Sequence, residues 1–279
     1  MAPLVKNKIN SFLRKKSTEL RLKILTTVFN SKTGHLGGSL SCVELLIYIF
    51  YSRNFKVGKL FFNKKERDRI VVSKGHCAVG FYSLLDDLGL LKKNEIKTFC
   101  KNNTRLGGHL SSKVPGVEVE TGSLGHGLSV AAGIGWSAKL NKKNFKIIVI
   151  VSDGELYEGS FWEALIFISH HKLTNVSIIV DRNRQIVMNH TESFLKLEPL
   201  DKKFSSFGFN VKKINGHNFK AIHNAFNSLK KNKPNIIIAD TIKAKGIKFM
   251  EGKLKWHHSI PNQKELNFAI KDFLNYHEK

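Results

Sequence analysis

Five short apolar runs constrain the fold of this 279-residue chain more than any other feature of its sequence. Most are rich in Ile and Val, and their hydrophobic residues follow one another instead of alternating with polar residues. Such runs are typical of strands that are buried on both faces of a sheet. We therefore predict strands at RIVVS (69–73), KIIVIVS (146–152), VSIIVD (176–181), FNVKKI (209–214) and NIIIADT (235–241).

Helical patterns lie between these strands, at 78–88, 128–140, 158–171 and 219–230. The alternation predicts an α/β fold with three layers, α/β/α, around a mostly parallel sheet. We expect the first ~50 residues to form two helices flanking a glycine-rich loop, and Gln263 to Tyr276 to form a terminal helix. No linker interrupts the pattern, so residues 1–279 are expected to form a single domain.

The composition argues against a membrane protein or a secreted one. The longest clean apolar run, Leu45 to Tyr51, is far shorter than the ~20 residues that span a bilayer. The basic N-terminus lacks the continuous apolar segment of a signal peptide. Cys42, Cys77 and Cys100 have no paired spacing and are interpreted as reduced core thiols. A cytoplasmic location is expected.

The formal net charge of +24 allows two interpretations. A strongly basic chain can bind nucleic acid. Here, however, the basic residues are spread over the whole sequence, and no zinc-finger, RNP or basic-zipper pattern accompanies them. Because net charge governs solubility and steering rather than fold, attraction of anionic substrates is the favoured interpretation, and no specific nucleic-acid partner is expected.

Histidines recur in the loops where chemistry is expected. In parallel sheets ligands bind beyond the carboxyl ends of the strands. A lone loop histidine is usually a surface residue, but three of this chain's Gly-His pairs and a Trp-His-His run lie in such loops: Gly34-His35, Gly75-His76, Gly108-His109 and Trp256–His258. Imidazoles suit proton transfer, and glycine-rich turns at helix starts, such as 120–127, present N–H groups to phosphate. The repetition favours a functional site.

Two oxygen side chains follow neighbouring predicted strands. Asp153 comes directly after strand 146–152, and Asn183, 30 residues further on, follows strand 176–181. Adjacent parallel strands lie ~5 Å apart, so these side chains can converge on one ion. Carboxylate, amide and carbonyl oxygens are the ligands of hard divalent cations. The spacing predicts a cation site that could bridge a diphosphate.

This arrangement resembles the thiamine-diphosphate motif, Gly-Asp-Gly followed about thirty residues later by Asn. Ser152 replaces the first glycine and leaves Asp153-Gly154 intact. The chain from about Lys32 to His258 resembles the N-terminal half of a transketolase. The similarity lies in TGHLGGSLS, DRIVVSKGHCAVGFY, PGVEVETGSLGHGLSVAAGIG, SDGELYEGSFWEA, HKLTNVSIIVDRNRQ and WHH.

The resemblance implies a thiamine-diphosphate-binding fold and assigns residues to the cofactor. It implies that Mg²⁺ (or Ca²⁺ or Mn²⁺) is held by the side chains of Asp153 and Asn183 and by the Gln185 backbone carbonyl. The implied cofactor contacts are His76, Gly122, Ser123, Leu124, Gly154, Glu158, Asn183 and His257.

The resemblance also implies substrate-handling residues: His35, His109 and His257, with His258 left open as an alternative to His257. Glu163 corresponds to an acidic position near the family's dimer contact, although a plain surface charge on a helix is the alternative.

Transketolases are normally more than twice this length. The resemblance therefore implies that the pyrimidine-binding and C-terminal domains lie on a separate chain, in an α2β2 heterotetramer. The implied activity is transfer of a two-carbon ketol (glycolaldehyde) unit from a ketose or its phosphate to an aldose or its phosphate. The chain alone is expected to be inactive.

Two other functions fit parts of this pattern. The α subunit of a 2-oxo-acid dehydrogenase shares the Asp and Asn motif, but EGSFWEA, TGHLGGSLS and WHH favour a transketolase. A non-catalytic binding protein on this fold would be expected to lack the metal or diphosphate residues. Asp153, Asn183 and the histidines are all present.

Overall fold

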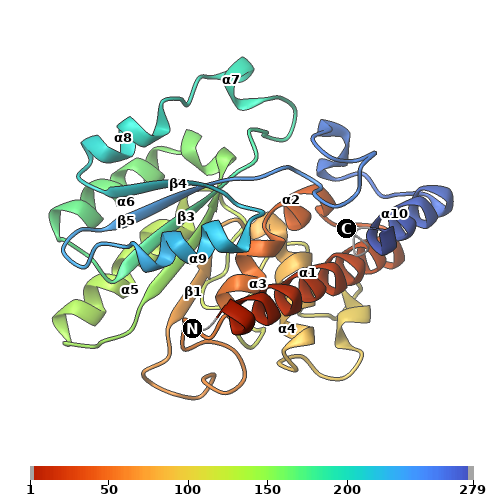
Figure 1. Ribbon diagram of the computed structural model, residues 1–279, viewed down its shortest axis with the longest axis horizontal. Coiled ribbons are helices and arrows are strands. Elements are labelled where there is room, and N and C mark those ends of the chain that lie inside the picture. The colour runs from red at the N-terminus through yellow and green to blue at the C-terminus, as the bar shows by residue number, and fades with distance from the viewer. Residues whose placement is uncertain (1–2, 276–279) are drawn as a thin grey trace.

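The computed structural model describes residues 3–275, built around a five-stranded sheet (Figure 1). The strands run parallel in the order β1-β2-β3-β5-β4, which confirms the predicted α/β fold with a parallel sheet. Each strand begins and ends within one residue of its predicted bounds. They are β1 (Arg69–Val72), β2 (Ile147–Ser152), β3 (Val176–Arg182), β4 (Asn210–Asn215) and β5 (Asn235–Asp240).

The central strand β2 shows why its sequence is an unbroken apolar run. Ile148 and Ile150 point into one hydrophobic cluster. Ile147, Val149 and Val151 point into the other, on the opposite face. Successive side chains of a strand alternate between faces, so a sheet covered on both sides needs apolar residues at every position. The two clusters make the three layers.

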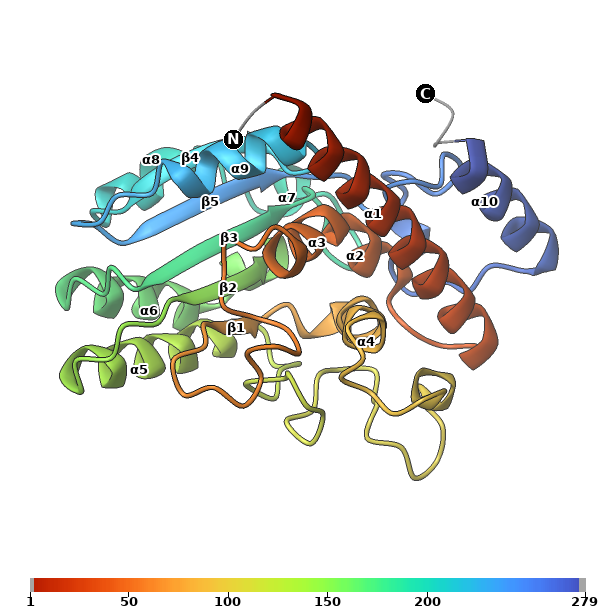
Figure 2. The same ribbon diagram turned by 60° about the horizontal axis from the view of Figure 1, so that its bottom comes forward.

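Three helices cover one face of the sheet: α5 (His126–Leu140), α6 (Gly159–His170) and α8 (Leu200–Ser206). Figure 2 shows α5 and α6 side by side along this face, and they contact each other closely. The buried part of this layer includes Phe161 and Phe204, and Trp162 stacks on Phe204 with ring centroids 5.8 Å apart. Aromatic packing of this kind anchors the helices that follow the strand ends.

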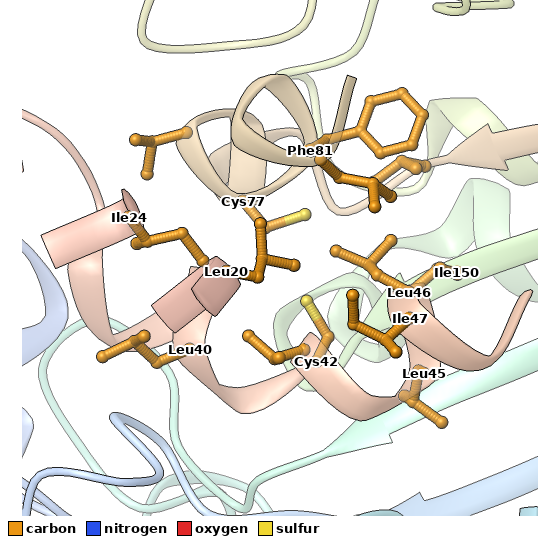
Figure 3. Packing of buried hydrophobic residues seen from close by; sticks show 14 of the residues in the cluster. Leu20, Ile24, Leu40, Cys42, Leu45, Leu46, Ile47, Cys77, Phe81 and Ile150 are labelled. Atoms are coloured by element: carbon orange, nitrogen blue, oxygen red, sulfur yellow. The ribbon is translucent and has the colours of Figure 1, made fainter. Parts of the chain in front are cut away.

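The other face carries the N-terminal helices and α9, and the C-terminal helix packs against α1. Figure 3 shows the centre of this layer, where Leu20 and Ile24 of α1 belong to one hydrophobic cluster with Cys42, Cys77 and Ile150. Cys42 and Cys77 are buried free thiols, as predicted, whereas Cys100 is only half-buried. The helices are α1 (Pro3–Ser31), α2 (Leu36–Ser41), α3 (Val43–Tyr51), α4 (Ala78–Asp87), α9 (Phe219–Asn227) and α10 (Gln263–Asn275). Tyr276, the predicted end of the last helix, lies outside the described residues.

The glycine-rich segment near the N-terminus is not the loop that the sequence predicted. Residues Leu36–Ser41 form the short helix α2, so three helices rather than two occupy the first ~50 residues. A Cβ at Gly37 would lie 2.5 Å from the Trp256 carbonyl oxygen, and one at Gly38 would lie 2.9 Å from His76 Cδ2. Because these glycines carry no side chain, α2 can pack closely against the loops that hold Trp256 and His76. The backbone of α2 remains helical.

Short 3₁₀ turns and a short helix complete the carboxyl-end edge of the sheet. The turn Asp153–Tyr157 directly follows β2, and the turn Gly75–Cys77 lies shortly after β1. The turn Leu254–His257 contains Trp256 and His257. Helix α7 (Thr191–Phe194) lies in the long connection after β3. Of the helices within residues 3–275, none is long and apolar enough to cross a membrane.

Candidate active site

Asp153 and Asn183 lie at adjoining strand ends, as their spacing predicted. The β2–β3 register pairs Ser152 with Asp181, so the residues that follow each strand leave the sheet together. Asp153 is completely buried, and its Oδ2 accepts a hydrogen bond from the backbone N–H of Arg184, next to Asn183. The carboxylate is therefore held against the loop that carries the amide.

The loop after β3 leaves suitable oxygens for a cation. Asn183 Oδ1 accepts from the Gln185 N–H at 3.1 Å, which fixes the amide. The carbonyl of Arg184 accepts from Thr191 N–H, and that of Ile186 accepts from Lys243 Nζ. The carbonyl of Gln185, the residue between these two, accepts no hydrogen bond from residues 3–275. A buried loop rarely leaves a carbonyl oxygen unused, so this oxygen fits a metal ligand.

The Asp153 carboxylate has an unusual electrostatic setting. Burial raises the pKa of Asp153 to about 6, even though the Arg182 guanidinium, 3.0 Å from Oδ1, acts in the opposite direction. Desolvation disfavours the charged form, and one cation does not fully offset it. A divalent cation bound here would supply the missing stabilisation of the ionised carboxylate.

Four histidines from three other segments gather around His35. The ring centroid of His35 lies 5.9 Å from His76, 5.5 Å from His109, 5.3 Å from His257 and 4.7 Å from His258. His76 also stacks on His257 at 5.7 Å. The structure thus brings together the three Gly-His pairs at 34–35, 75–76 and 108–109 with the Trp-His-His run.

The inner histidines are kept neutral. Burial, reinforced by neighbouring positive groups, lowers the pKa of His35 to about 4 and that of His257 to about 3. Burial likewise holds the pKa of His76 well below its ordinary value. The Nδ1 atoms of His35 and His257 are buried and have no hydrogen-bond partner within the described residues. A neutral imidazole with a free nitrogen can exchange hydrogen bonds or a proton with a hydroxyl group.

His257 and His258 differ in their placement. His257 is half-buried beside His76, whereas His258 is exposed although its ring contacts His35. The geometry favours His257 as the inward-facing residue of the pair.

The glycine-rich run before α5 also reaches this site. A Cβ at Gly75 would lie 2.7 Å from the Gly122 nitrogen, and one at Gly122 would lie 3.2 Å from His109 Cγ. Leu124 Cδ1 lies 3.4 Å from where a Cβ of Gly154 would be. Bare backbone at these glycines lets the loops after β1, β2 and residue 121 approach one another. Ser123 is exposed at their edge.

The acidic residues of the turn after β2 divide into structural and surface positions. Glu155, which the sequence did not single out, is buried and accepts hydrogen bonds from Ser73 Oγ, Ser152 N–H at 2.8 Å and Gly125 N–H at 3.3 Å. Ser152, the departure from the motif, thereby caps this turn. Glu158 and Glu163 are exposed, so their predicted roles stay predictions.

Two buried lysines near the histidines were also missed. Lys74 donates to Asp181, to Ser41 Oγ at 2.9 Å and to the Gly38 carbonyl at 2.7 Å. Burial alone would lower the pKa of Lys74, but the Asp181 carboxylate outweighs it and holds that pKa above its ordinary value. This lysine is fully paired and structural.

Lys243 is different, because its charge is free to meet a ligand. Burial, and then the charge of Lys74, lowers the pKa of Lys243 to about 8. Its Nζ donates to the Ile186 carbonyl at 3.1 Å, which uses one of its three N–H groups. Its charge acts on His35 and His257. We use the name cation loop for Asp153 together with residues 183–186 after β3. Lys243 therefore connects the cation loop with the histidines. Its position just beyond strand 235–241 was the available sequence signal.

The fold and this site define a parallel α/β protein built to bind an anionic, cation-bridged cofactor at the carboxyl ends of its strands. The description "Transketolase, thiamine diphosphate binding domain" matches residues 14–277. The chain belongs to the transketolase family, whose members are transferases, and this region is the family's thiamine-diphosphate-binding domain.

Two relatives match over nearly their whole length. One is named as a single subunit of the apulose-4-phosphate transketolase of Phocaeicola vulgatus. It is 36% identical over 272 residues, covering 96% of this chain and 95% of that one. The protein of the same name from Actinobacillus succinogenes is 38% identical over 263 residues, covering 93% and 95%.

Solved structures of longer transketolases share the fold. The Campylobacter jejuni transketolase superposes with a TM-score of 0.87 at 30% identity, over 94% of this chain and 42% of that one. The chain thus spans about two fifths of that full-length enzyme. These matches support the transketolase interpretation over the 2-oxo-acid dehydrogenase alternative.

Proposed function

We propose that this chain is the cofactor-binding subunit of a split transketolase, which moves a two-carbon ketol unit from a ketose to an aldose. One observation carries the proposal. The oxygens of the cation loop and the neutral histidines meet at one edge of the sheet, with Lys243 between them. The relatives named as transketolase subunits support it.

The residues present fit thiamine diphosphate with a divalent cation. The side chains of Asp153 and Asn183 and the free carbonyl of Gln185 would hold the cation. Lys243, His76 and the backbone of Gly154 would face the diphosphate, because they provide positive charge or donors beside the cation loop. When bound, the cofactor supplies the carbanion chemistry that breaks and forms the carbon–carbon bond.

The histidines would handle the hydroxyl groups of the sugar. His35 and His257 provide neutral imidazoles, and His109 provides an exposed one. Their ring nitrogens can accept or donate hydrogen bonds. The free Nδ1 atoms of His35 and His257 are suited to orient a hydroxyl group or to hold its proton. The donor and acceptor would be phosphorylated sugars, since the chain is strongly basic and both relatives are named for a sugar phosphate.

A second chain would complete the enzyme. The relatives that match over almost their full length are each named as one subunit of an enzyme, and a full-length transketolase is more than twice as long as this chain. We propose a partner that carries the pyrimidine-binding and C-terminal domains, in an α2β2 assembly, with residues 1–279 forming one domain. The exposed Glu158 and Glu163 are available to such contacts. The free thiols of the core are in keeping with a cytoplasmic enzyme.

The test is a mixing experiment with Mg²⁺ and thiamine diphosphate. The purified chain is assayed for ketol transfer from a ketose phosphate to an aldose phosphate. The chain is assayed alone and then with a second protein that carries the pyrimidine-binding and C-terminal domains of a transketolase. We expect turnover only in the mixture. Turnover by this chain alone would contradict the split enzyme, and decarboxylation of pyruvate with a lipoyl partner would support the dehydrogenase alternative.

A further inference from the structure

Arg182, the last residue of β3, is buried beside the cation loop. It has no exposed side-chain surface. Its guanidinium donates to four side chains at once. The contacts are Asp153 Oδ1 at 3.0 Å, Thr191 Oγ1 at 2.8 Å, Glu192 Oε1 at 2.8 Å and Glu198 Oε1 at 3.1 Å. A buried arginine is costly unless its donors are paired, so this arrangement needs a reason.

The contact with Asp153 fixes the direction of a cation ligand. A carboxylate has about four lone-pair sites. One site on Oδ1 is used by Arg182, and one on Oδ2 is used by the Arg184 N–H. With one bond on each oxygen, the carboxylate plane cannot rotate freely, and a lone pair on each oxygen is left for an ion. Groups that orient a metal ligand in this way strongly affect metal affinity.

The remaining contacts of Arg182 hold the segment behind the site. Glu192 accepts from the N–H groups of Leu197 at 3.3 Å and Glu198 at 3.4 Å. Glu198 accepts from the Leu200 N–H at 3.0 Å. The segment 191–200 is therefore folded onto the guanidinium. Because Thr191 N–H binds the Arg184 carbonyl, the same segment also holds the loop that contains Gln185.

The single positive charge of Arg182 is outnumbered by the negative charges of its carboxylate partners. Three carboxylates, those of Asp153, Glu192 and Glu198, surround one guanidinium. Arg182 balances part of this negative charge and bonds to only one of the two Asp153 oxygens.

We infer that Arg182 is a positioning residue for the cation, which pre-orients Asp153 so that the site accepts a small ion with strict geometry. The inference rests on the proposed cofactor site. Mg²⁺ demands near-ideal octahedral coordination, whereas Ca²⁺ tolerates flexible and irregular coordination. Loss of the pre-orientation therefore weakens Mg²⁺ binding more than Ca²⁺ binding. A merely structural role would weaken both ions equally.

The experiment is a calorimetric titration with Mg²⁺, and separately with Ca²⁺, in the presence of thiamine diphosphate, carried out on the purified chain alone and on its complex with the partner chain. Arg182→Gln is expected to bind Mg²⁺ about 10–100-fold more weakly, the range typical of groups that orient a metal ligand. Its loss for Ca²⁺ is expected to be clearly smaller. Unchanged Mg²⁺ affinity in the folded variant, or equal losses for both ions, would overturn the inference.

Glu198→Gln is the matched control. It removes the negative charge of a partner of Arg182 and leaves the contact between Arg182 and Asp153 in place, so the Mg²⁺ affinity should stay at the wild-type value. If Arg182→Gln does not fold, Arg182→Lys serves in its place. It keeps the charge, but a single ammonium cannot span Asp153 and Glu198 together, so Mg²⁺ binding should again weaken more than Ca²⁺ binding. Wild-type affinity in the lysine variant would count against the inference.

The controls separate this inference from the proposed function. If the wild-type chain binds neither ion with thiamine diphosphate, either alone or together with the partner chain, the proposed cofactor site itself is wrong. If the wild-type chain binds Mg²⁺ and Arg182→Gln binds it equally well, only the role of Arg182 is wrong.

Discussion

The two halves of the site are built in opposite ways. In the cation loop, the side chains of Asp153 and Asn183 are hydrogen-bonded within the chain. In the histidine cluster, the buried Nδ1 atoms of His35 and His257 have no partner among the described residues. One half is held by hydrogen bonds and an ion pair, and the other mainly by packing of rings against one another.

This difference indicates which half is complete before a ligand arrives. The chain itself orients the cation ligands, so that half should bind its ion with little rearrangement. The histidines have unmet hydrogen-bonding capacity, which is costly for buried groups and is relieved by a polar ligand. The comparison therefore predicts that the cation loop governs cofactor binding and that the histidines govern the substrate.

The largest expected effect comes from breaking the cation half. Asp153→Ala removes a ligand together with its charge, so Mg²⁺-dependent binding of thiamine diphosphate should weaken by more than ~100-fold. That value is the upper end of the loss expected when a group that only orients a metal ligand is removed. The matched change in the other half, His35→Asn, should alter this affinity far less. Calorimetric titration measures both, and equal losses would contradict the division of labour.

A smaller effect is expected from the packing that supports the histidine half. Gly37→Ala places a Cβ 2.5 Å from the backbone carbonyl oxygen of Trp256, which cannot move away as a flexible side chain could. Forced overpacking of this kind costs about 1–3 kcal/mol, which exceeds the gain in helix propensity from alanine. Urea denaturation should show the loss, and His257 should be displaced. An unchanged unfolding midpoint would mean that α2 does not set the position of the Trp-His pair.

The pH dependence of stability should come partly from the histidine half. His35 and His257 have pKa values of about 4 and about 3 in the folded chain, below the value near 6.5 of an unfolded histidine. Between these values the unfolded chain binds more protons, so stability is full above pH ~6.5 and falls as the pH drops from there toward ~4 for His35 and toward ~3 for His257. The groups that face His35 are His76, His109, His257, His258, Lys74 and Lys243.

His35→Asn should therefore reduce the loss of stability between pH 7 and pH 5. Solvent screening reduces the contribution of His35 to the pH dependence of stability, because His35 is only half-buried. Urea unfolding at the two pH values, compared with the wild-type chain, measures it. Carboxylates elsewhere contribute equally to both proteins and cancel in the comparison. An identical pH dependence in the variant would show that His35 is not held neutral.

The smallest effect should come from a glycine that belongs to neither half. Gly133 lies on the exposed face of α5, and a Cβ there would meet no atom within 4 Å. Gly133→Ala should stabilise the chain by about 0.5–1 kcal/mol through helix propensity alone and leave cofactor binding unchanged. Urea denaturation measures it. A loss of stability would indicate that this surface needs glycine for a contact within the molecule.

The sequence predicted those features that depend on local pattern. Strands buried on both faces leave continuous apolar runs, so the sheet and its strand ends were predicted to within one residue. Asp153 and Asn183 followed from strand ends that are neighbours in the chain and also in the sheet. The Gly-His pairs were recognised by repetition, although their meeting point at His35 depends on loops far apart in sequence.

Features that depend on tertiary contacts were not predictable in this way. Glycines ordinarily disfavour helices, so a loop was expected at Leu36–Ser41. These glycines instead permit close packing on Trp256 and His76, which the local sequence pattern does not show. Arg182 and Lys243 are two of many basic residues in the sequence. What distinguishes them is burial beside Asp153 and His35, which no local pattern encodes.

The central claim is that the oxygens at the ends of β2 and β3 hold the cation of a diphosphate cofactor. The most direct measurement is anomalous diffraction from crystals grown with Mn²⁺ and thiamine diphosphate. We expect one strong manganese peak in contact with the Asp153 carboxylate, the Asn183 amide oxygen and the Gln185 carbonyl, adjoining diphosphate density. A peak at other residues, or cofactor density without any metal at this loop, would contradict the account.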